Sequence, residues 1–177
     1  MNSDIPQPKW DSGKPYESLI ATAEYYHLQA KHSFLEDKTH AHILFLISKE
    51  HGVVSVNPLP PDVTDKQILG GVRQAIREHN LYAVITIAEA WTYFPTSNRD
   101  HTLVQLMHNE MRVADLRAED KVECLMVRTE CKDGDGFVWI TLISRDRQDC
   151  DNVTLGESVR VPLEKYLKKG RFFGGRF

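Results

Sequence analysis

The chain has 177 residues, of which 41% are hydrophobic and 27% are charged, and its formal net charge is -3. This length and composition are typical of one globular domain that buries a core of its own. The longest apolar runs, near 43–47 and 81–87, are far shorter than the roughly 18 apolar residues of a membrane span, so we expect no span.

The N-terminus and the cysteines indicate a cytoplasmic protein. The first residues are polar and rich in proline, without the basic and apolar regions of a secretory signal. The three cysteines, Cys124, Cys131 and Cys150, form no C-x-x-C pair and cannot all pair within one chain. We therefore expect reduced thiols, with Cys124 and Cys131 buried in or beside strands rather than acting as nucleophiles.

An arm and a helix are predicted at the start of the chain. Residues 1–14 hold two prolines, a glycine and Trp10, which predicts an extended arm that docks through the indole. Pro15 suits the first turn of a helix, and apolar residues then follow at three- and four-residue steps from Tyr16 to Phe34.

The next elements are a hairpin, a second helix and a long strand. The runs at 41–48 and 52–56 flank a turn and predict the hairpin. Thr64 or Asp65 is a suitable N-cap for a helix that ends near Asn80. The β-branched run at 81–93 predicts a central strand, and this strand, helix, strand passage permits a parallel crossover.

The second half of the chain predicts a further hairpin. Residues 122–129 and 137–144 flank the sequence Asp-Gly-Asp-Gly at 133–136, which favours a tight turn. Residues 156–161 are a candidate edge strand. Residues 95–120 are polar, and no helix or strand is assigned to them.

Together these elements predict a single α+β domain at 15–159, between an arm at 1–14 and a basic aromatic tail at 160–177. We expect a mixed, mainly antiparallel sheet of about five strands, with the two helices on one face. The other face of the sheet would need cover, which a dimer or the aromatic tail would supply.

Two short motifs lie between Val84 and Asp146. A strand ends in the sequence AEAW at 88–91, and RAED at 117–120 leads into a later strand. This arrangement resembles a group of small uncharacterised proteins from bacterial and phage genomes, in which a Ser-Glu-Ala-Trp-like strand end precedes an Arg-Glu-Glu-like strand start. Ala88 stands in place of the serine and Asp120 in place of the glutamate. No activity is known for that group, so the resemblance implies only the order of the strands.

His40 and His42 have the best local spacing for a metal ion. At i and i+2 in a strand their side chains would point to the same face and could reach one ion. A third ligand would have to come from Asp100 with His101, from His108 or from Glu89. The spacing matches no known metalloenzyme motif, so we prefer solvated histidines and expect no cofactor.

Glu89 is a carboxylate inside an apolar strand. Alternation places it on the same face as Ile85, Ile87 and Trp91. Burial would raise its pKa and suit it to act as a general base. We prefer a structural ion pair with Arg117 or Arg128.

The tail reverses the charge of the chain. Residues 160–177 hold six Lys or Arg and one acidic residue, a net charge of +5 that leaves -8 on residues 1–159. Cations interleaved with aromatic rings can bind nucleic acid, but an acidic body would repel phosphates. We therefore favour docking of the tail on the body or on a second subunit. The expected interaction residues are Lys168, Lys169, Arg171, Phe172, Phe173, Arg176 and Phe177.

No catalytic motif stands out, and we expect a non-enzymatic cytoplasmic protein-interaction module that forms a homo-oligomer or binds another protein. One alternative is a small metal-dependent hydrolase that uses His40, His42 and a carboxylate. The other is a nucleic-acid accessory protein that acts through the tail.

Overall fold

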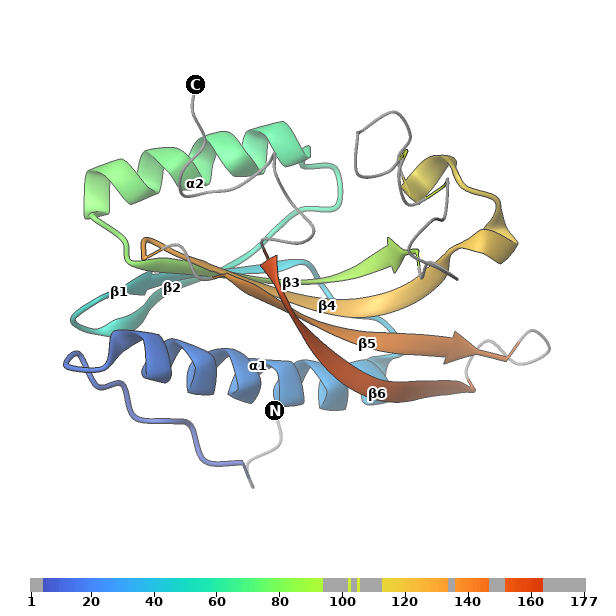
Figure 1. Ribbon diagram of the computed structural model, residues 1–177, viewed down its shortest axis with the longest axis horizontal. Helices are drawn as coiled ribbons and strands as arrows, with labels where there is room; N and C mark the ends of the chain where they lie inside the picture. Colours follow the sequence, from blue (N-terminus) through green and yellow to red (C-terminus); the bar gives the residue numbers. More distant parts are fainter. Residues whose placement is uncertain are drawn as a thin grey trace.

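Two helices lie on opposite faces of one antiparallel sheet in the computed structural model (Figure 1). The structure describes residues 5–93, 102, 105, 113–133, 136–146 and 152–163. Within these ranges the strand order is β2-β1-β3-β4-β5-β6. The helices and strands are α1 (Pro15–Asp37), β1 (Ile43–Ser48), β2 (Gly52–Pro58), α2 (Asp65–His79), β3 (Ala83–Thr92), β4 (Val122–Cys131), β5 (Phe137–Arg145) and β6 (Val153–Pro162), and two 3-10 turns, η1 (Val113–Asp115) and η2 (Ala118–Asp120), precede β4.

The predicted α+β class is confirmed, and the sheet is more regular than expected. It has six strands rather than about five, because β6 is a full strand of 10 residues and not a short edge. Among the described strands, every neighbouring pair is antiparallel. β2 and β3, which α2 connects, do run parallel to each other, but β1 lies between them.

The expectation that both helices share one face of the sheet is wrong. Phe45 and Ile85 belong to the core under α1, whereas Leu44 and Val84 belong to the core under α2. Because successive strand residues point to opposite faces, an uninterrupted apolar run such as ILFLI in β1 needs cover on both sides. One helix on each face supplies that cover.

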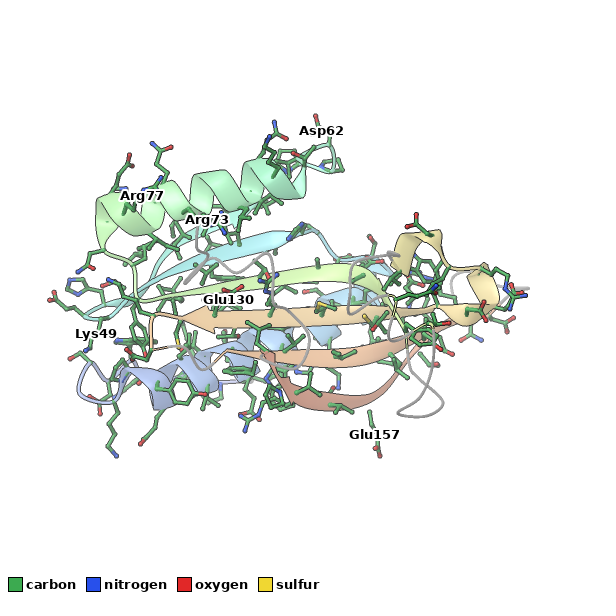
Figure 2. All side chains as sticks on the ribbon, turned by 45° about the horizontal axis from the view of Figure 1, so that its top comes forward. Lys49, Asp62, Arg73, Arg77, Glu130 and Glu157 are labelled. Atoms are coloured by element: carbon green, nitrogen blue, oxygen red, sulfur yellow. The ribbon has the colours of Figure 1, made fainter. Side chains whose placement is uncertain are left out.

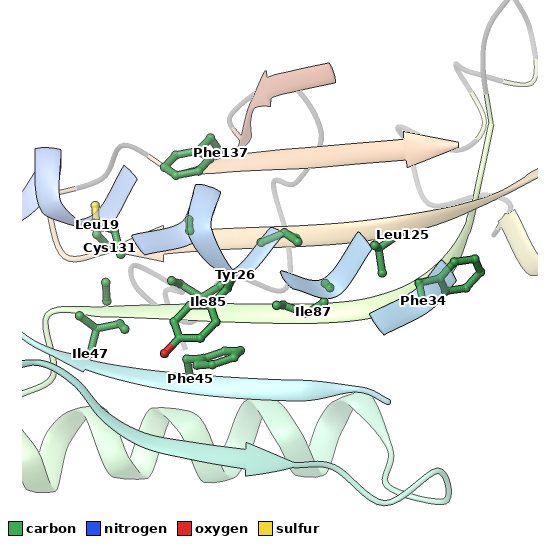
Figure 3. Packing of buried hydrophobic residues seen from close by; sticks show 14 of the residues in the cluster. Leu19, Tyr26, Phe34, Phe45, Ile47, Ile85, Ile87, Leu125, Cys131 and Phe137 are labelled. Carbon is green, nitrogen blue, oxygen red and sulfur yellow. The ribbon is translucent and has the colours of Figure 1, made fainter. Parts of the chain in front are cut away.

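The larger core lies between α1 and the sheet. Tyr26 of α1 contacts Phe45 of β1 with ring centroids 4.2 Å apart, and Phe34 is fully buried near the end of the helix (Figure 3). The buried stripe of α1 also contains polar residues, among them Thr22, His27 and Gln29. Neither described helix combines the length and the apolar character that a membrane crossing requires.

The helix ends follow from local sequence. Pro15 occupies the first turn of α1, and Lys38 ends the helix in the left-handed conformation. Thr64 caps α2 in a complete capping box with Gln67, and Asn80 ends that helix with a φ of 48°. The predicted cap and stop of α2 are therefore both present.

The N-terminal arm docks through its indole. Trp10 donates a hydrogen bond from Nε1 to the carbonyl of Lys49 at 2.9 Å and meets the ring of Tyr82 edge to face. The indole also covers Gly52, where a Cβ atom would lie 2.9 Å from two of its ring carbons. Gly52 has a φ of +71°, so the turn between β1 and β2 needs glycine both for its backbone and for contact with the arm.

Candidate functional site

Glu89 lies where α1 ends over the sheet, and all of its carboxylate is engaged. Oε1 accepts hydrogen bonds from the hydroxyl of Thr39, at 2.8 Å, and from the backbone N–H of His40. Oε2 forms an ion pair with Nη2 of Arg145 at 3.2 Å. These donors bind the ionised carboxylate, so the geometry favours a structural role for Glu89 over proton transfer.

Arg145 joins three strands and one helix end. Its Nε and Nη2 each lie 2.8 Å from an oxygen of Glu123 in β4. Its Nη1 donates to the carbonyl of Lys38, the C-cap of α1, at 2.9 Å, and the guanidinium lies 5.4 Å from the ring centroid of Phe34. We call Glu89, Glu123 and Arg145 the arginine cluster. It holds the C-terminus of α1 on β3, β4 and β5.

The arginine that pairs with Glu89 is thus neither of the two we expected. Arg117 pairs with Glu119 and Asp120, and Arg128 pairs with Glu130. Arg128 stands opposite Thr86 in the register between β3 and β4, so its side chain points to the α2 face, away from Glu89. Arg145 lies in β5, two strands away from Glu89 in β3. The contact between them can be predicted only when the complete strand order is known.

The two candidate metal ligands do not form a site with described residues. His40 and His42 precede β1, which begins at Ile43, so the strand geometry assumed for them is absent. His40 directs Nδ1 to the carbonyl of Ala41 at 2.6 Å. Within the described ranges, no group of three His, Cys, Asp or Glu is arranged to hold a metal ion. The remaining candidates, Asp100, His101 and His108, lie outside the described residues.

A buried polar chain that the sequence analysis missed joins α1 to β5 and β6. His27 Nε2 lies 2.7 Å from the hydroxyl of Thr141, which lies 2.8 Å from the hydroxyl of Ser158. Lys31 donates to that serine at 3.3 Å, and the imidazole stacks on the ring of Trp139. The spacing held a clue, because His27 follows Ala23 by four residues on the buried stripe of the helix.

Burial determines the charge state of His27 in this hydrogen-bonded group. His27 is only 2% exposed, and this burial, with a smaller effect of the Lys31 charge, lowers its pKa from 6.5 to about 4. The imidazole is therefore neutral at physiological pH and a weak base. Its hydrogen bond to Thr141 satisfies a buried polar atom and positions α1 on the sheet.

The described cysteines are also structural. Cys124 and Cys131 are buried, as expected, and neither forms a disulfide with a described residue, whereas Cys150 lies outside the described residues. Burial, followed by the nearby charge of Glu123, raises the pKa of Cys124 to about 11. Its thiol stays protonated at neutral pH and is a poor nucleophile.

The two edges of the sheet differ in their protection. β6 carries Glu157, which projects from the strand in Figure 2, and Arg160, whose guanidinium lies over the rings of Phe137 and Trp139. A bulge interrupts its pairing with β5, and it ends at Pro162. β2, with the sequence GVVSVNP, has no charged residue at all. Both edge strands contain a bulge and end at a proline, so the charged residues of β6 are what make it the better protected edge.

No protein family, curated protein or solved structure matches this chain. Its function is therefore inferred from its own residues.

Only the beginning of the tail belongs to the described residues. Leu163 is buried and donates its N–H to the carbonyl of Gly136 at 2.9 Å, so the chain is anchored to the sheet up to this residue. The expected interaction residues from Lys168 to Phe177 lie outside the described residues.

We predict that deleting residues 168–177 lowers the melting temperature, by roughly 5 °C or more if two or three phenylalanines are buried. The physical reason is that three phenylalanines in this segment would be an exposed liability unless they dock. Thermal melting and sedimentation velocity of the full chain and of the truncated chain measure the effect.

Two full-length variants identify which side chains matter. Serine at Phe172, Phe173 and Phe177 should reproduce the loss, whereas glutamine at the four cations of 168–177 should not. If melting and sedimentation stay unchanged in the truncated chain, the tail does not dock. Salt-sensitive binding of nucleic acid that the glutamine variant loses would instead support the nucleic-acid alternative.

Proposed function

We propose that this protein is a non-enzymatic cytoplasmic protein-interaction module that binds by adding a partner strand to β2. The observation that carries the proposal is the exposed, uncharged edge of this strand. Val54 and Val56 are 49% and 51% exposed, and in the described part of the chain β2 has a neighbouring strand on one side only. An edge of this kind is a ready template for another extended chain.

The pairing of β2 with β1 indicates which backbone groups are available. Leu59 donates its N–H to the carbonyl of His42 at 2.7 Å. Because the direction of backbone groups alternates in an antiparallel strand, those of Asn57 and Ser55 also point to β1, and those of Val56 point outward. Val54 is skipped in the register with β1 and is the extra residue of a bulge, which is left out of the ladder.

The stretch available for pairing is short. The bulge at Val54 precedes it, and Pro58, which has no N–H, follows it. A partner strand would thus gain backbone hydrogen bonds at Val56, and it would contact the exposed side chains of Val54 and Val56. In this mode of recognition the main-chain hydrogen bonds give affinity and the exposed side chains give specificity.

The chemistry of the described residues supports a binding role rather than a catalytic one. The carboxylate of Glu89 is occupied by its donors, the thiol of Cys124 is protonated, and the imidazole of His27 is buried. The proposed cytoplasmic location is supported by Cys124 and Cys131, which form no disulfide with a described residue.

A display library of extended peptides tests the proposal. We expect the selected peptides to be uncharged and rich in β-branched residues, and their affinity to fall about tenfold or more for Val56→Lys. The matched control is Val159→Lys, which places the same charge at a valine of β6 that is 54% exposed. Peptides that bind the Val56→Lys protein as well as the parent, or that lose binding with Val159→Lys, would contradict the proposal.

A further inference from the structure

We infer that the strand that adds to β2 is β2 of a second copy of this chain, so that two sheets join edge to edge around a two-fold axis. This inference rests on the proposed function and names its partner. A symmetric pair of identical surfaces is the commonest way for a protein to form a homodimer.

The backbone determines the register of such a pair. An antiparallel two-fold centred on Ser55 places Val54 opposite Val56 of the partner subunit. The backbone groups of Val56 point away from β1, and the bulge leaves Val54 out of the ladder, so this register joins the two residues of β2 that β1 does not engage. Centring the axis on Val56 would instead place Val54 opposite Pro58 of the partner subunit, which has no N–H to donate. The first register is therefore favoured.

The side chains suit the same register. Val56 is the register partner of Phe45 in β1, and Phe45 belongs to the core under α1. Val56 of the second copy would add to this apolar face beside the junction. Since β2 has no charged residue, its self-pairing brings no like charges together along the strands.

Two exposed charges of opposite sign, Lys49 and Asp62, flank β2, and the carboxylate of Glu50 beside Lys49 contacts His51. Lys49 and Asp62 are both exposed and lie at opposite ends of the strand, in the turn before it and in the loop after it (Figure 2). A two-fold axis at Ser55 turns each end of one strand toward the opposite end of the other. Lys49 then approaches Asp62 of the partner subunit twice across the junction, which favours a second copy over an unrelated segment.

Analytical ultracentrifugation of the full chain over a range of concentrations tests the inference. We expect a monomer–dimer equilibrium in the parent. Val56→Lys should raise the dissociation constant about tenfold or more, because it places two lysines near each other across the axis. Val159→Lys, the matched change on the other edge, should leave the dissociation constant unchanged. Circular dichroism checks the fold of each variant, and we expect both to be folded because both valines are exposed.

Charge reversal tests the register itself. Lys49→Glu and Asp62→Lys should each weaken the dimer, since each brings like charges together, and the double variant should restore it. Hydrogen exchange provides a backbone readout: the amide of Val56 should exchange more slowly as protein concentration rises. A dimer that tolerates Val56→Lys would overturn the inference.

The outcomes separate this inference from the proposed function. A parent that stays monomeric, with library peptides still sensitive to Val56→Lys, overturns the self-pairing and leaves strand addition standing. A monomeric parent whose peptides ignore Val56→Lys overturns both. A dimer that is lost on deletion of residues 168–177 and kept in Val56→Lys places the interface at the tail and overturns the self-pairing.

Discussion

Replacing Arg145 with alanine should lower the free energy of unfolding by about 3 kcal/mol, because it leaves two mostly buried carboxylates without their cation. Glu89 and Glu123 would then face each other as like charges. The carbonyl of Lys38, at the end of α1, would also lose its donor. Urea denaturation followed by circular dichroism at neutral pH measures the change.

The chain offers a matched control in Arg117. Its ion pair with Asp120 is closer than that of Arg145 with Glu89, but the Arg117 side chain is 74% exposed. Arg117→Ala should therefore leave the free energy of unfolding almost unchanged, because an exposed ion pair contributes little to stability. If Arg145→Ala is no more destabilising than Arg117→Ala, the arginine cluster is not what holds α1 on the sheet.

Glu89→Gln separates the structural role of Glu89 from a catalytic one. We expect a smaller loss than for Arg145→Ala, about 1 kcal/mol, because Arg145 keeps its contacts with Glu123. A Glu89→Gln protein that is as stable as the parent and lacks an activity of the parent would support the general-base interpretation instead.

Local features of the fold could be predicted, whereas the placement of the helices could not. Pro15, Thr64 and Asn80 define helix ends through contacts within a few residues, so their effect is visible in the sequence. The choice of face depends on which side of the sheet each connection crosses. The apolar runs of β1 and β3 indicated that both faces of the sheet are buried, but not which helix covers which face.

The same limit applies to the candidate site. Alternation along β3 placed Glu89 on a face with apolar residues, and this was enough to predict an arginine partner but not to choose it. Arg145 reaches Glu89 across β4, and the order of three strands decides that contact. His27 was missed because its partners, Thr141 and Ser158, are more than a hundred residues away in sequence.

His27 should make the protein less stable in acid by about 3 kcal/mol between pH 6.5 and about pH 4. Above pH 6.5 the imidazole is neutral in both the folded and the unfolded chain, so it contributes no pH dependence. Below pH 6.5 the unfolded chain takes up a proton that the buried imidazole of the folded chain does not accept. Stability falls with decreasing pH, by about 1.4 kcal/mol per pH unit, until the folded state is protonated as well near pH 4.

Unfolding by urea at several pH values, for the parent and for His27→Gln, isolates this contribution. Glutamine does not titrate and keeps an amide that can bond to Thr141, so the variant should lose stability at neutral pH but fall less steeply below pH 6.5. Between pH 6.5 and about pH 4, the free energy of unfolding of the parent should therefore fall by about 3 kcal/mol relative to that of His27→Gln. His51→Gln, at a side chain that is 75% exposed, is the control and should follow the parent. If the plots of stability against pH are parallel for the parent and His27→Gln, the imidazole binds its proton as well in the folded state as in the unfolded state. Its burial between α1 and β5 would then not lower its pKa.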